Sequence, residues 1–377
     1  MSRAVGAVAG SVSPGYEIVR ATFAEVVESQ QPGTGAAFAA VVDGHLVVDL
    51  WGGETNAAGR PWQEDTLAVL FSGTKGIVAT ALLTLVEQRR VLLTDRVADH
   101  WPAFAAAGKT DITVAQLGAH AAGLPYVSEA LGAADLADLD VVAELLALQA
   151  PVTPVGRPCY HAITWGWLMD GLIRHACHTG ATDLVREALA EPHDLDLRIG
   201  LAGDRDAEGR LAMVSRSPDY QLSAMAVKDP DPRLEQVYAR PHLREDDAAW
   251  LQHPMPAANG IATARAVATL YGAVLTGRVI GMQTLGAAVA PAAEGPDPLS
   301  GRPLRFGPSG YELAGTPSEL GPADDAFGHT GAGGSSHGAW PSLRTAFSFV
   351  TSELRREGRD DRARRLLDGL YTALRRA

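Results

Sequence analysis

The chain has 377 residues, 46% of them hydrophobic and 20% charged, which is typical of a globular protein with room for a second folded unit. Its formal net charge is −12, and its arginine-rich run at 355–365 is interrupted by acidic residues, so neither nucleic acid nor a membrane is an expected partner. The two cysteines, Cys159 and Cys177, lack a C-x-x-C spacing, and there is no strong secretory signal or membrane-length apolar run, so we expect a reducing, cytoplasmic location.

The first predicted elements are a β-hairpin and a buried helix. Residues 36–51 form two β-rich runs around Asp43-Gly44, a dipeptide favoured in tight hairpin turns. The stretch GIVATALLTLVEQRR at 76–90 lacks proline and carries apolar residues at helical spacings. An antiparallel sheet therefore begins early, and Ser72 lies at the start of the helix that follows.

Helical patterns dominate the middle of the chain, and sheet elements return near its end. The helical stretches are separated by Pro and Gly loops and lie at 133–149, 164–180 and 181–194. Farther on, Thr263 can cap a helix at 264–277, and a Pro/Gly-rich stretch at 291–310 predicts loops. A strand is expected at 345–351, followed by an amphipathic helix whose apolar face carries Leu366, Leu367, Leu370 and Leu374. Sheet elements at both ends with helices between them indicate an α+β fold.

The stretch FSGTKGIVAT at 71–80 places a scarce residue type beside a serine. Lys75, Lys109 and Lys228 are the only lysines among 32 basic residues, and lysine, unlike arginine, can lose its proton when it is desolvated. Positions three apart share one face of a helix, so Ser72 Oγ and Lys75 Nζ can approach each other. The helix N-terminus adds free N–H groups, and the combination suits acyl transfer. By itself S-x-x-K is a weak motif, and Lys75 could equally extend its ammonium to water.

Two later segments offer the remaining groups that acyl transfer needs. CYHAITWGW at 159–167 places Tyr160 before a helix, where its phenol, near a cationic Lys75, could serve as a second proton acceptor. FGHTGAGGSS at 327–336 is glycine-rich, adjoins the predicted strand, and can present backbone N–H groups to a substrate. Each segment alone also fits a half-buried tyrosine or an ordinary turn, whereas the ordered set is specific.

Five segments, taken in chain order, resemble the successive signatures of the serine β-lactamase and penicillin-binding-protein superfamily, in its class C-like branch. They are SGTK, ITVAQLGAHAAGLP, YHAITWGW, NGIATARAVATLY and FGHTGAGGS. The chain is most similar to the β-lactamase-fold carboxylesterases called family VIII. The resemblance implies an α/β domain, antiparallel sheet flanked by helices, from 1–95 and 249–377. It also implies a mainly helical domain at 96–248, with the active site between the two.

The resemblance also implies the roles of individual residues. Ser72 would be the acylated nucleophile, and Lys75 its general base or proton partner. Tyr160 matches the tyrosine of the family's Tyr-x-Asn element and would pass a proton to the leaving alkoxide and later activate water. The oxyanion hole would consist of the backbone N–H groups of Ser72 and Ala332.

Two departures from the lactamase pattern favour an ester substrate. Tyr-x-Asn reads Tyr160-His161-Ala162, so the amide that helps to hold a β-lactam is missing. Lys-Thr-Gly reads His329-Thr330-Gly331, which replaces a permanent cation with an imidazole that is mostly neutral at pH 7. We therefore expect a carboxylesterase that binds its substrate near these three residues, with Tyr126 lining an apolar acyl pocket. A β-lactamase, or a D-amino-acid peptidase or acyltransferase of the same fold, is the alternative.

Other functions have weaker support in the sequence. GSSHG at 334–338 fits the G-x-S-x-G nucleophile elbow with Ser336, but a strand-like run follows it and no histidine occurs after His337. His175 and His178 have the spacing of a ligand pair without an H-E-x-x-H motif, so no metal is expected. A binding module without activity would not need the serine, lysine and tyrosine together. We expect no cofactor, a small ester as substrate, and leave homo-oligomer formation open.

Overall fold

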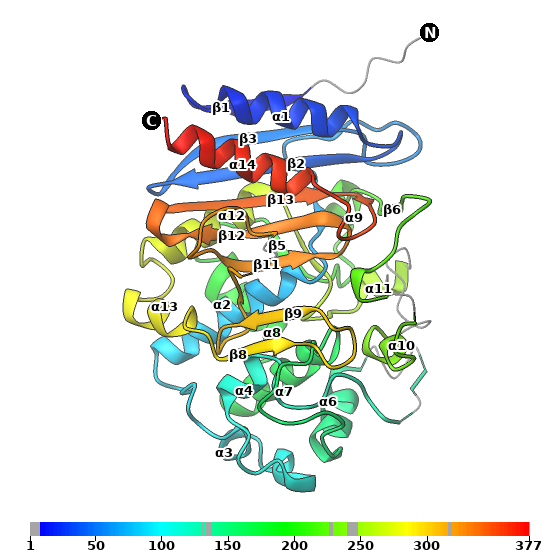
Figure 1. Cartoon of the computed structure of the whole chain (residues 1–377), viewed down its shortest axis with the longest axis vertical. Helices are drawn as coiled ribbons and strands as arrows, with labels where there is room; N and C mark the ends of the chain where they lie inside the picture. The colour runs from blue at the N-terminus through cyan, green and yellow to red at the C-terminus, as the bar shows by residue number, and fades with distance from the viewer. Residues whose placement is uncertain are drawn as a thin grey trace.

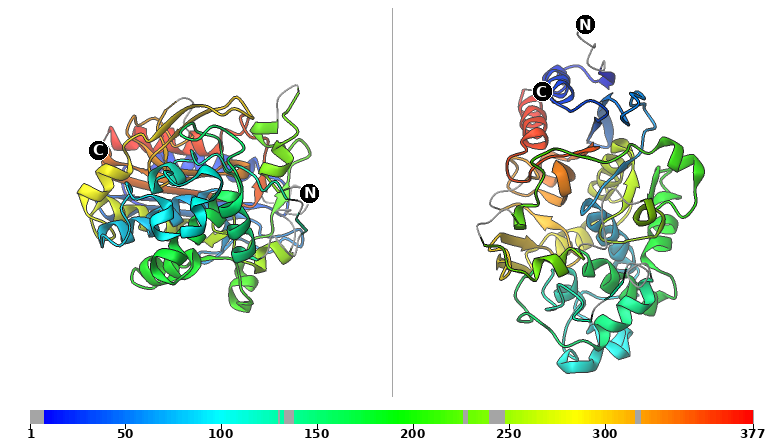
Figure 2. Two further views of the ribbon diagram at one scale, coloured as in Figure 1. Left: turned by 90° about the horizontal axis from the view of Figure 1, so that it is seen from below. Right: turned by 90° about the vertical axis from the view of Figure 1, so that its right-hand side faces the viewer.

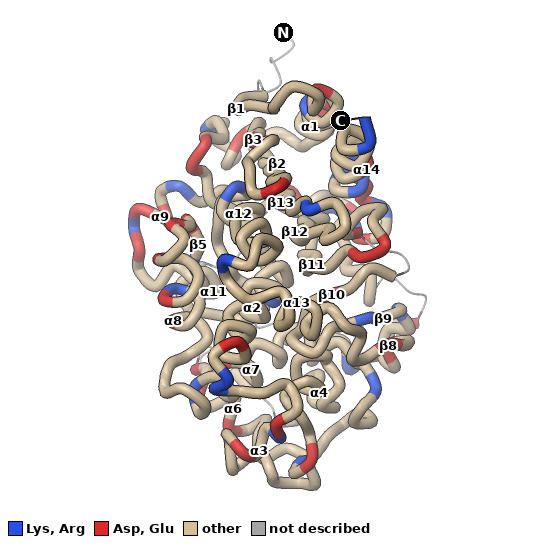
Figure 3. The backbone as a smooth tube through the Cα atoms, turned by 90° about the vertical axis from the view of Figure 1, so that its left-hand side faces the viewer, with Lys and Arg blue, Asp and Glu red and all other residues tan. Residues whose placement is uncertain are grey.

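The structure is a computed structural model that describes residues 8–129, 131–132, 138–225, 229–239, 248–315 and 319–376. Part of the predicted helix at 133–149, and Lys228, lie outside these ranges. Within them, no helix is long and apolar enough to cross a lipid bilayer. The tube in Figure 3 shows basic and acidic residues interspersed along the chain, without a long stretch of one sign.

A nine-stranded antiparallel sheet extends from the top of the molecule in Figure 1 to below its middle, where β9 and β8 lie, and its strands come from both ends of the chain. Its order is β1-β3-β2-β13-β12-β11-β10-β9-β8. The strands are β1 (Ala9–Val12), β2 (Gly35–Val42), β3 (His45–Gly53), β8 (Ala293–Pro296), β9 (Pro303–Phe306), β10 (Glu312–Leu313), β11 (Phe327–Gly331), β12 (Ser335–Trp340) and β13 (Thr345–Thr351). Two small sheets join β4 (Ala68–Val69), β7 (Gly260–Ala262) and β5 (Leu197–Ile199), and β14 (Glu353–Leu354) with β6 (Ser215–Arg216).

The predicted hairpin is confirmed, and its turn explains its sequence. β2 and β3 pair with Val42 opposite His45, so Asp43 and Gly44 form the two-residue loop. Both have positive φ values, 51° and 80°, which is the conformation of a type I′ turn and the reason why Asp-Gly is favoured there.

Helices cover both faces of the sheet. On one face lie α1 (Glu17–Glu28) and α14 (Arg362–Leu374), whose leucines at 366, 367 and 370 are fully buried against the sheet, as predicted. On the other face lie α2 (Gly73–Glu87) and α12 (Ala264–Leu275). The predicted cap of α12 is confirmed, because the Thr263 side chain accepts a hydrogen bond from Ala266 N at 3.1 Å. The right-hand view of Figure 2 shows α1 and α14 together at one side of the molecule.

The lowest part of the molecule in Figure 1, below β8, is mainly helical. α2 is buried along nearly its whole length because it is apolar on every side. The remaining helices are α3 (Val97–His100), α4 (Val114–Gly118), α6 (Leu139–Leu148), α7 (Thr164–Cys177), α8 (Ala181–Val185), α9 (Arg205–Arg210), α10 (Leu234–Val237), α11 (Ala248–Gln252) and α13 (Met282–Ala288).

The prediction of loops at 291–310 was wrong in part. β8 and β9 lie in this stretch and form a hairpin at the sheet edge, with Pro296 opposite Pro303. Pro296 is tolerated because β8 is the edge strand and leaves one row of its backbone groups unpaired, and Pro303 is tolerated because it is the first residue of β9. This hairpin carries side chains to the site described below.

Candidate active site

A strained turn presents Ser72 at the N-terminus of α2. The residue before it, Phe71, has a φ of 49°, a left-handed conformation that is uncommon outside glycine. Thr74 Oγ1 donates to the Phe71 carbonyl at 2.6 Å, and the Phe71 ring stacks on Trp250 with centroids 6.1 Å apart. Although Ser72 is at the N-cap position, its side chain makes no capping hydrogen bond. The hydroxyl is therefore available to other partners.

Lys75 lies one turn into α2 and contacts this hydroxyl. Its Nζ is 3.1 Å from Ser72 Oγ and donates to the carbonyl of Ala257 at 2.9 Å. The side chain is fully buried, and this burial holds the pKa of Lys75 well below its ordinary value, against a smaller opposing effect of Glu312. The amine is thus driven toward the neutral form that can accept a proton from Ser72. Sequence reasoning missed Ala257, because a backbone carbonyl leaves no residue-type signal.

Tyr160 contacts the same hydroxyl from the other side. Its Oη donates to Ser72 Oγ at 2.9 Å, and Lys75 Nζ lies 5.1 Å from the centre of its ring. Burial raises the pKa of Tyr160, and the hydrogen bond with Ser72 opposes this rise only in part. The expectation that a cationic Lys75 would make Tyr160 a proton acceptor is not supported, since the lysine is itself driven toward neutrality. The geometry favours Tyr160 as a proton donor.

The end of strand β11, which lies between β12 and β10 in the sheet, brings the candidate oxyanion groups to this serine. Gly331 is required by close approach, because a Cβ there would lie 2.4 Å from the carbonyl oxygen of Leu70. Ala332 follows directly and lines the same pocket as Ser72. Among the described residues, no turn or loop hydrogen bond uses the backbone N–H of Ser72 or of Ala332. The resemblance implies that these two groups bind the carbonyl oxygen of the substrate.

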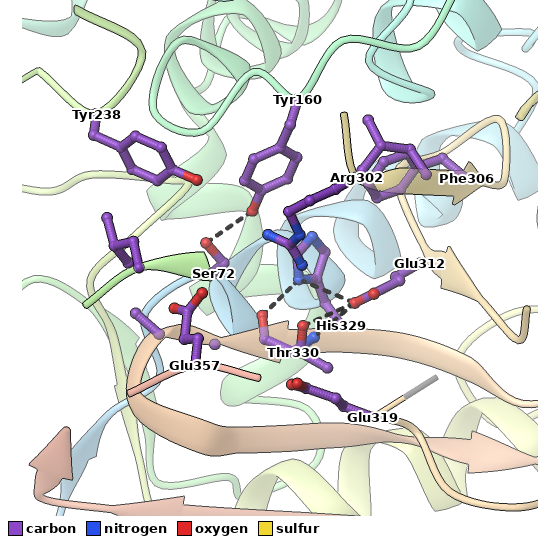
Figure 4. A pocket seen from close by; sticks show the side chains of 14 residues that line it. Ser72, Tyr160, Tyr238, Arg302, Phe306, Glu312, Glu319, His329, Thr330 and Glu357 are labelled. Atoms are coloured by element: carbon purple, nitrogen blue, oxygen red, sulfur yellow. Dashed lines mark hydrogen bonds and ion pairs between the residues drawn. The ribbon is translucent and has the colours of Figure 1, made fainter. Parts of the chain in front are cut away.

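These groups share one pocket (Figure 4). Six predicted site residues line it: Ser72, Tyr160, His329, Thr330, Gly331 and Ala332. Tyr126, which was predicted to line an acyl pocket, is not among the described residues that line this one. It packs instead against a neighbouring cluster that includes Cys159 and Ala162, and its carbonyl accepts a hydrogen bond from Gln149 Nε2 at 3.0 Å. Tyr238, from the end of α10, lines the pocket wall in its place.

His329 is buried and neutral. Its side chain is 3% exposed, and its Nδ1–H donates to the carbonyl of Thr330 at 2.7 Å. Burial, with a contribution from Lys75, lowers the pKa of His329 to about 3. Glu312 fixes the next residue, because it accepts hydrogen bonds from Thr330 N at 3.1 Å and Thr330 Oγ1 at 3.0 Å. The site therefore lacks the permanent cation that the lactamase pattern has at this position.

Sequence reasoning missed the charged residues of the pocket. Arg302 enters from the β8–β9 hairpin, Glu312 from β10, and Glu319 and Glu357 from two loops (Figure 4). None belongs to a motif with a fixed spacing. Their meeting depends on how the sheet edge and the loops pack, which a single sequence does not reveal.

The rival sites are not formed. Ser336 lies inside β12, is 1% exposed, and donates to the carbonyl of Glu319 at 2.8 Å, so it has no helix after it and no access to substrate. His175 donates to the carbonyl of Gly171 at 2.8 Å and stacks on Trp101, while His178 ends α7. In the described part of the chain, no group of three or more His, Cys, Asp or Glu side chains could hold a metal ion.

Comparison with known proteins agrees with this geometry. The model of a family described as Beta-lactamase matches residues 19–371. The esterase/beta-lactamase LipL of Mycobacterium tuberculosis is 35% identical over 363 residues, which cover 92% of this chain and 83% of LipL.

Two solved structures are similar over nearly the whole chain. A family VIII carboxylesterase superposes with a TM-score of 0.89 at 32% identity, covering 97% of this chain and 100% of its own. A penicillin-binding-protein homologue from Caulobacter crescentus has the same TM-score at 31% identity and the same coverage. These matches, together with the serine, lysine and tyrosine in one pocket, show that the chain belongs to the beta-lactamase family and is a serine hydrolase of that fold.

Proposed function

We propose that the protein is a carboxylesterase that works through an acyl-enzyme on Ser72. The observation that carries this proposal is the position of Ser72 Oγ, 3.1 Å from Lys75 Nζ and 2.9 Å from Tyr160 Oη, in a pocket that Ala332 also lines. A hydroxyl needs a nearby base to become a nucleophile, and the developing oxyanion needs preorganised donors. The candidate base and the candidate oxyanion donors lie around the same hydroxyl, that of Ser72.

In the first half-reaction, Ser72 Oγ attacks the ester carbonyl and its proton passes to the neutral amine of Lys75. The N–H groups of Ser72 and Ala332 hold the oxyanion of the tetrahedral intermediate. Tyr160, a protonated phenol within hydrogen-bond reach, gives its proton to the leaving alkoxide as the ester C–O bond breaks, and Lys75 can then return a proton to the tyrosine. In the second half-reaction, water attacks the acyl carbonyl and gives a proton to the pair of Lys75 and Tyr160. The bond between the acyl carbon and Ser72 Oγ then breaks, the carboxylic acid is released, and the proton returns to Ser72 Oγ.

An ester fits this site better than a β-lactam. Ala162, at the position of the missing amide, is 2% exposed and packs among apolar residues, so it offers the substrate no hydrogen bond. His329 is neutral, so it offers no cation to a lactam carboxylate. The alternatives, a β-lactamase or a D-amino-acid peptidase or acyltransferase, would share Ser72, Lys75 and Tyr160 but need recognition groups that these two positions lack.

The proposal is tested in two steps on one purified sample. Intact-protein mass after treatment with a fluorophosphonate, followed by peptide mapping, should place a single adduct on Ser72, and an adduct on Ser336 would overturn the assignment. The ratio of kcat/KM for p-nitrophenyl acetate or butyrate to that for a chromogenic cephalosporin should strongly favour the esters. If the cephalosporin is the better substrate, the chain is a β-lactamase and His329 has a binding role that this proposal denies it.

A further inference from the structure

The pocket beside Ser72 carries more negative than positive charge. Three carboxylates line it, those of Glu312, Glu319 and Glu357, with one guanidinium, that of Arg302 (Figure 4). Within the described residues, Arg302 forms no ion pair with any of them. The guanidinium therefore offsets one unit of negative charge without forming a direct ion pair. The carboxylate oxygens remain available to a substrate.

The hydrogen bonds of the carboxylates leave their charge uncompensated. Glu357 accepts from Ser223 N at 3.0 Å and from Ser223 Oγ at 2.8 Å, and Glu312 is held by Thr330 in the same way. These hydrogen-bond donors are neutral, so they hold the carboxylates in place without neutralising their negative charge. Glu319 is open to solvent on one side, yet desolvation in the pocket and the nearby Glu357 and Glu312 raise the pKa of Glu319 to about 7.

A second and independent feature is the unused nitrogen of His329. Because its Nδ1 donates to the Thr330 carbonyl, which can only accept, the proton of the neutral ring is on Nδ1 and Nε2 keeps its lone pair. This Nε2 is buried and has no hydrogen-bond partner in the described structure, although the ring lines the pocket. A buried acceptor without a partner is costly, and a donor on a bound ligand would relieve that cost.

We propose that this pocket selects esters that carry an ammonium group and disfavours esters that carry a carboxylate. An ammonium supplies three N–H donors and one positive charge, which matches a pocket lined by three carboxylates and by an imidazole whose Nε2 has no hydrogen-bond partner in the described structure. At pH 8, above the pKa of Glu319, a substrate carboxylate would add a further negative charge to the three that line the pocket, against the single positive charge of Arg302. The inference rests on the proposed esterase function and names the substrate class of the same site.

The experiment compares esters of nearly equal shape and different charge. The first set consists of phenyl acetates with a 4-aminomethyl, 4-ethyl or 4-carboxymethyl group, and thus varies the leaving alcohol. The second set compares the p-nitrophenyl esters of 4-(trimethylammonio)butanoate and 5,5-dimethylhexanoate, and thus varies the acyl chain by charge alone. At pH 8, in at least one set, kcat/KM should be roughly three- to tenfold higher for the cation than for its neutral partner. The carboxymethyl ester should be the poorest of its set.

Charge-removing variants should change the ratio of kcat/KM for cationic to neutral esters in opposite directions, depending on the sign of the charge that is removed. Glu357→Gln and Glu319→Gln should each lower the cation-to-neutral ratio, whereas Arg302→Gln should raise it. Glu187→Gln, the same change at an exposed position outside the pocket, should leave the ratio unchanged. Raising the salt concentration from about 0.05 M to about 0.5 M should also lower the ratio in the wild type, because mobile ions screen charges in an open pocket.

The failures of the two proposals are distinguishable. Absence of turnover with every neutral ester overturns the esterase function itself. Turnover of neutral esters with equal ratios for cation and neutral partner in both sets overturns the charge selection alone. A preference for the carboxymethyl ester that Arg302→Gln abolishes would also overturn it, because Arg302 would then be the binding group for an anionic substrate.

Discussion

Replacement of Lys75 by methionine separates its charge from its bulk, because methionine is similar in length and has no proton to exchange. The amine is the only described group within hydrogen-bond reach of Ser72 Oγ, apart from Tyr160 Oη. Loss of a positioned general base lowers rates by about 10²- to 10⁴-fold, so kcat/KM for p-nitrophenyl butyrate should fall by that factor. This fall corresponds to about 3 to 5 kcal/mol of transition-state stabilisation.

The same substitution should change the pH dependence of stability. In the unfolded chain the pKa of lysine is about 10.4, and in the folded protein burial holds that of Lys75 well below its ordinary value. Between these two values the unfolded state binds the proton and the folded state does not, so stability rises with pH, by about 1.4 kcal/mol per pH unit. Lys75→Met lacks this slope. The free energy of unfolding of the variant minus that of the wild type should therefore be larger at pH 7 than at pH 9. We expect this difference to fall by up to about 2.7 kcal/mol between the two pH values.

The assay is urea denaturation of both proteins at pH 7 and pH 9, with kcat/KM measured on the same samples. The lost hydrogen bond to Ala257 affects both pH values equally and cancels. Lys109→Met is the matched control, because Lys109 is also fully buried and bonds only to backbone carbonyls outside the pocket, those of Ala106 and Gln149. It should leave kcat/KM of the folded enzyme within a few fold. A stability difference between Lys75→Met and wild type that is equal at pH 7 and pH 9 would show that Lys75 keeps its proton, and the role of base would then pass to Tyr160.

Three further predictions follow from contacts in the site. Ser72→Ala should remove ester turnover and the fluorophosphonate adduct while the melting temperature stays within a few degrees; a retained adduct would contradict the assignment. Tyr160→Phe should lower kcat/KM by about 10²- to 10⁴-fold for alkyl esters and less for p-nitrophenyl esters, whose leaving group needs no proton; equal losses would refute its role as donor. Arg362→Met should cost about 3 to 5 kcal/mol in urea denaturation, because Arg362 is 1% exposed and pairs with the buried Asp360 at 2.6 Å. It should also lower kcat, since Arg362 donates to the carbonyl of Gly333 at 2.9 Å, next to Ala332. Arg364→Met, at an exposed position of the same helix, is its control, and a loss below about 1 kcal/mol in Arg362→Met would contradict the argument.

Features that depend on residues within one short segment could be predicted from the sequence. Asp43-Gly44 specifies its hairpin because few residues tolerate two successive positive φ values. The proline-free apolar run after Ser72 specifies a buried helix, and helical periodicity then places Lys75 one turn from the serine. The order of the motifs along the chain was sufficient to predict the family and to propose Ser72 as the nucleophile, because both depend on residue types and spacings within single segments.

The substrate-facing part of the site was decided by tertiary structure. Tyr126 and Tyr238 lie more than a hundred residues apart, and only the packing of the loops determines which of them reaches the pocket. Arg302 depends on a proline-bearing hairpin that reads as loop, because an edge strand needs no complete ladder of hydrogen bonds. The protonation states of Lys75, Tyr160 and His329 depend on burial, and burial is a property of all the neighbours at once. Residue type determines which group can titrate, whereas the desolvation that shifts its pKa exists only after distant segments have packed around it.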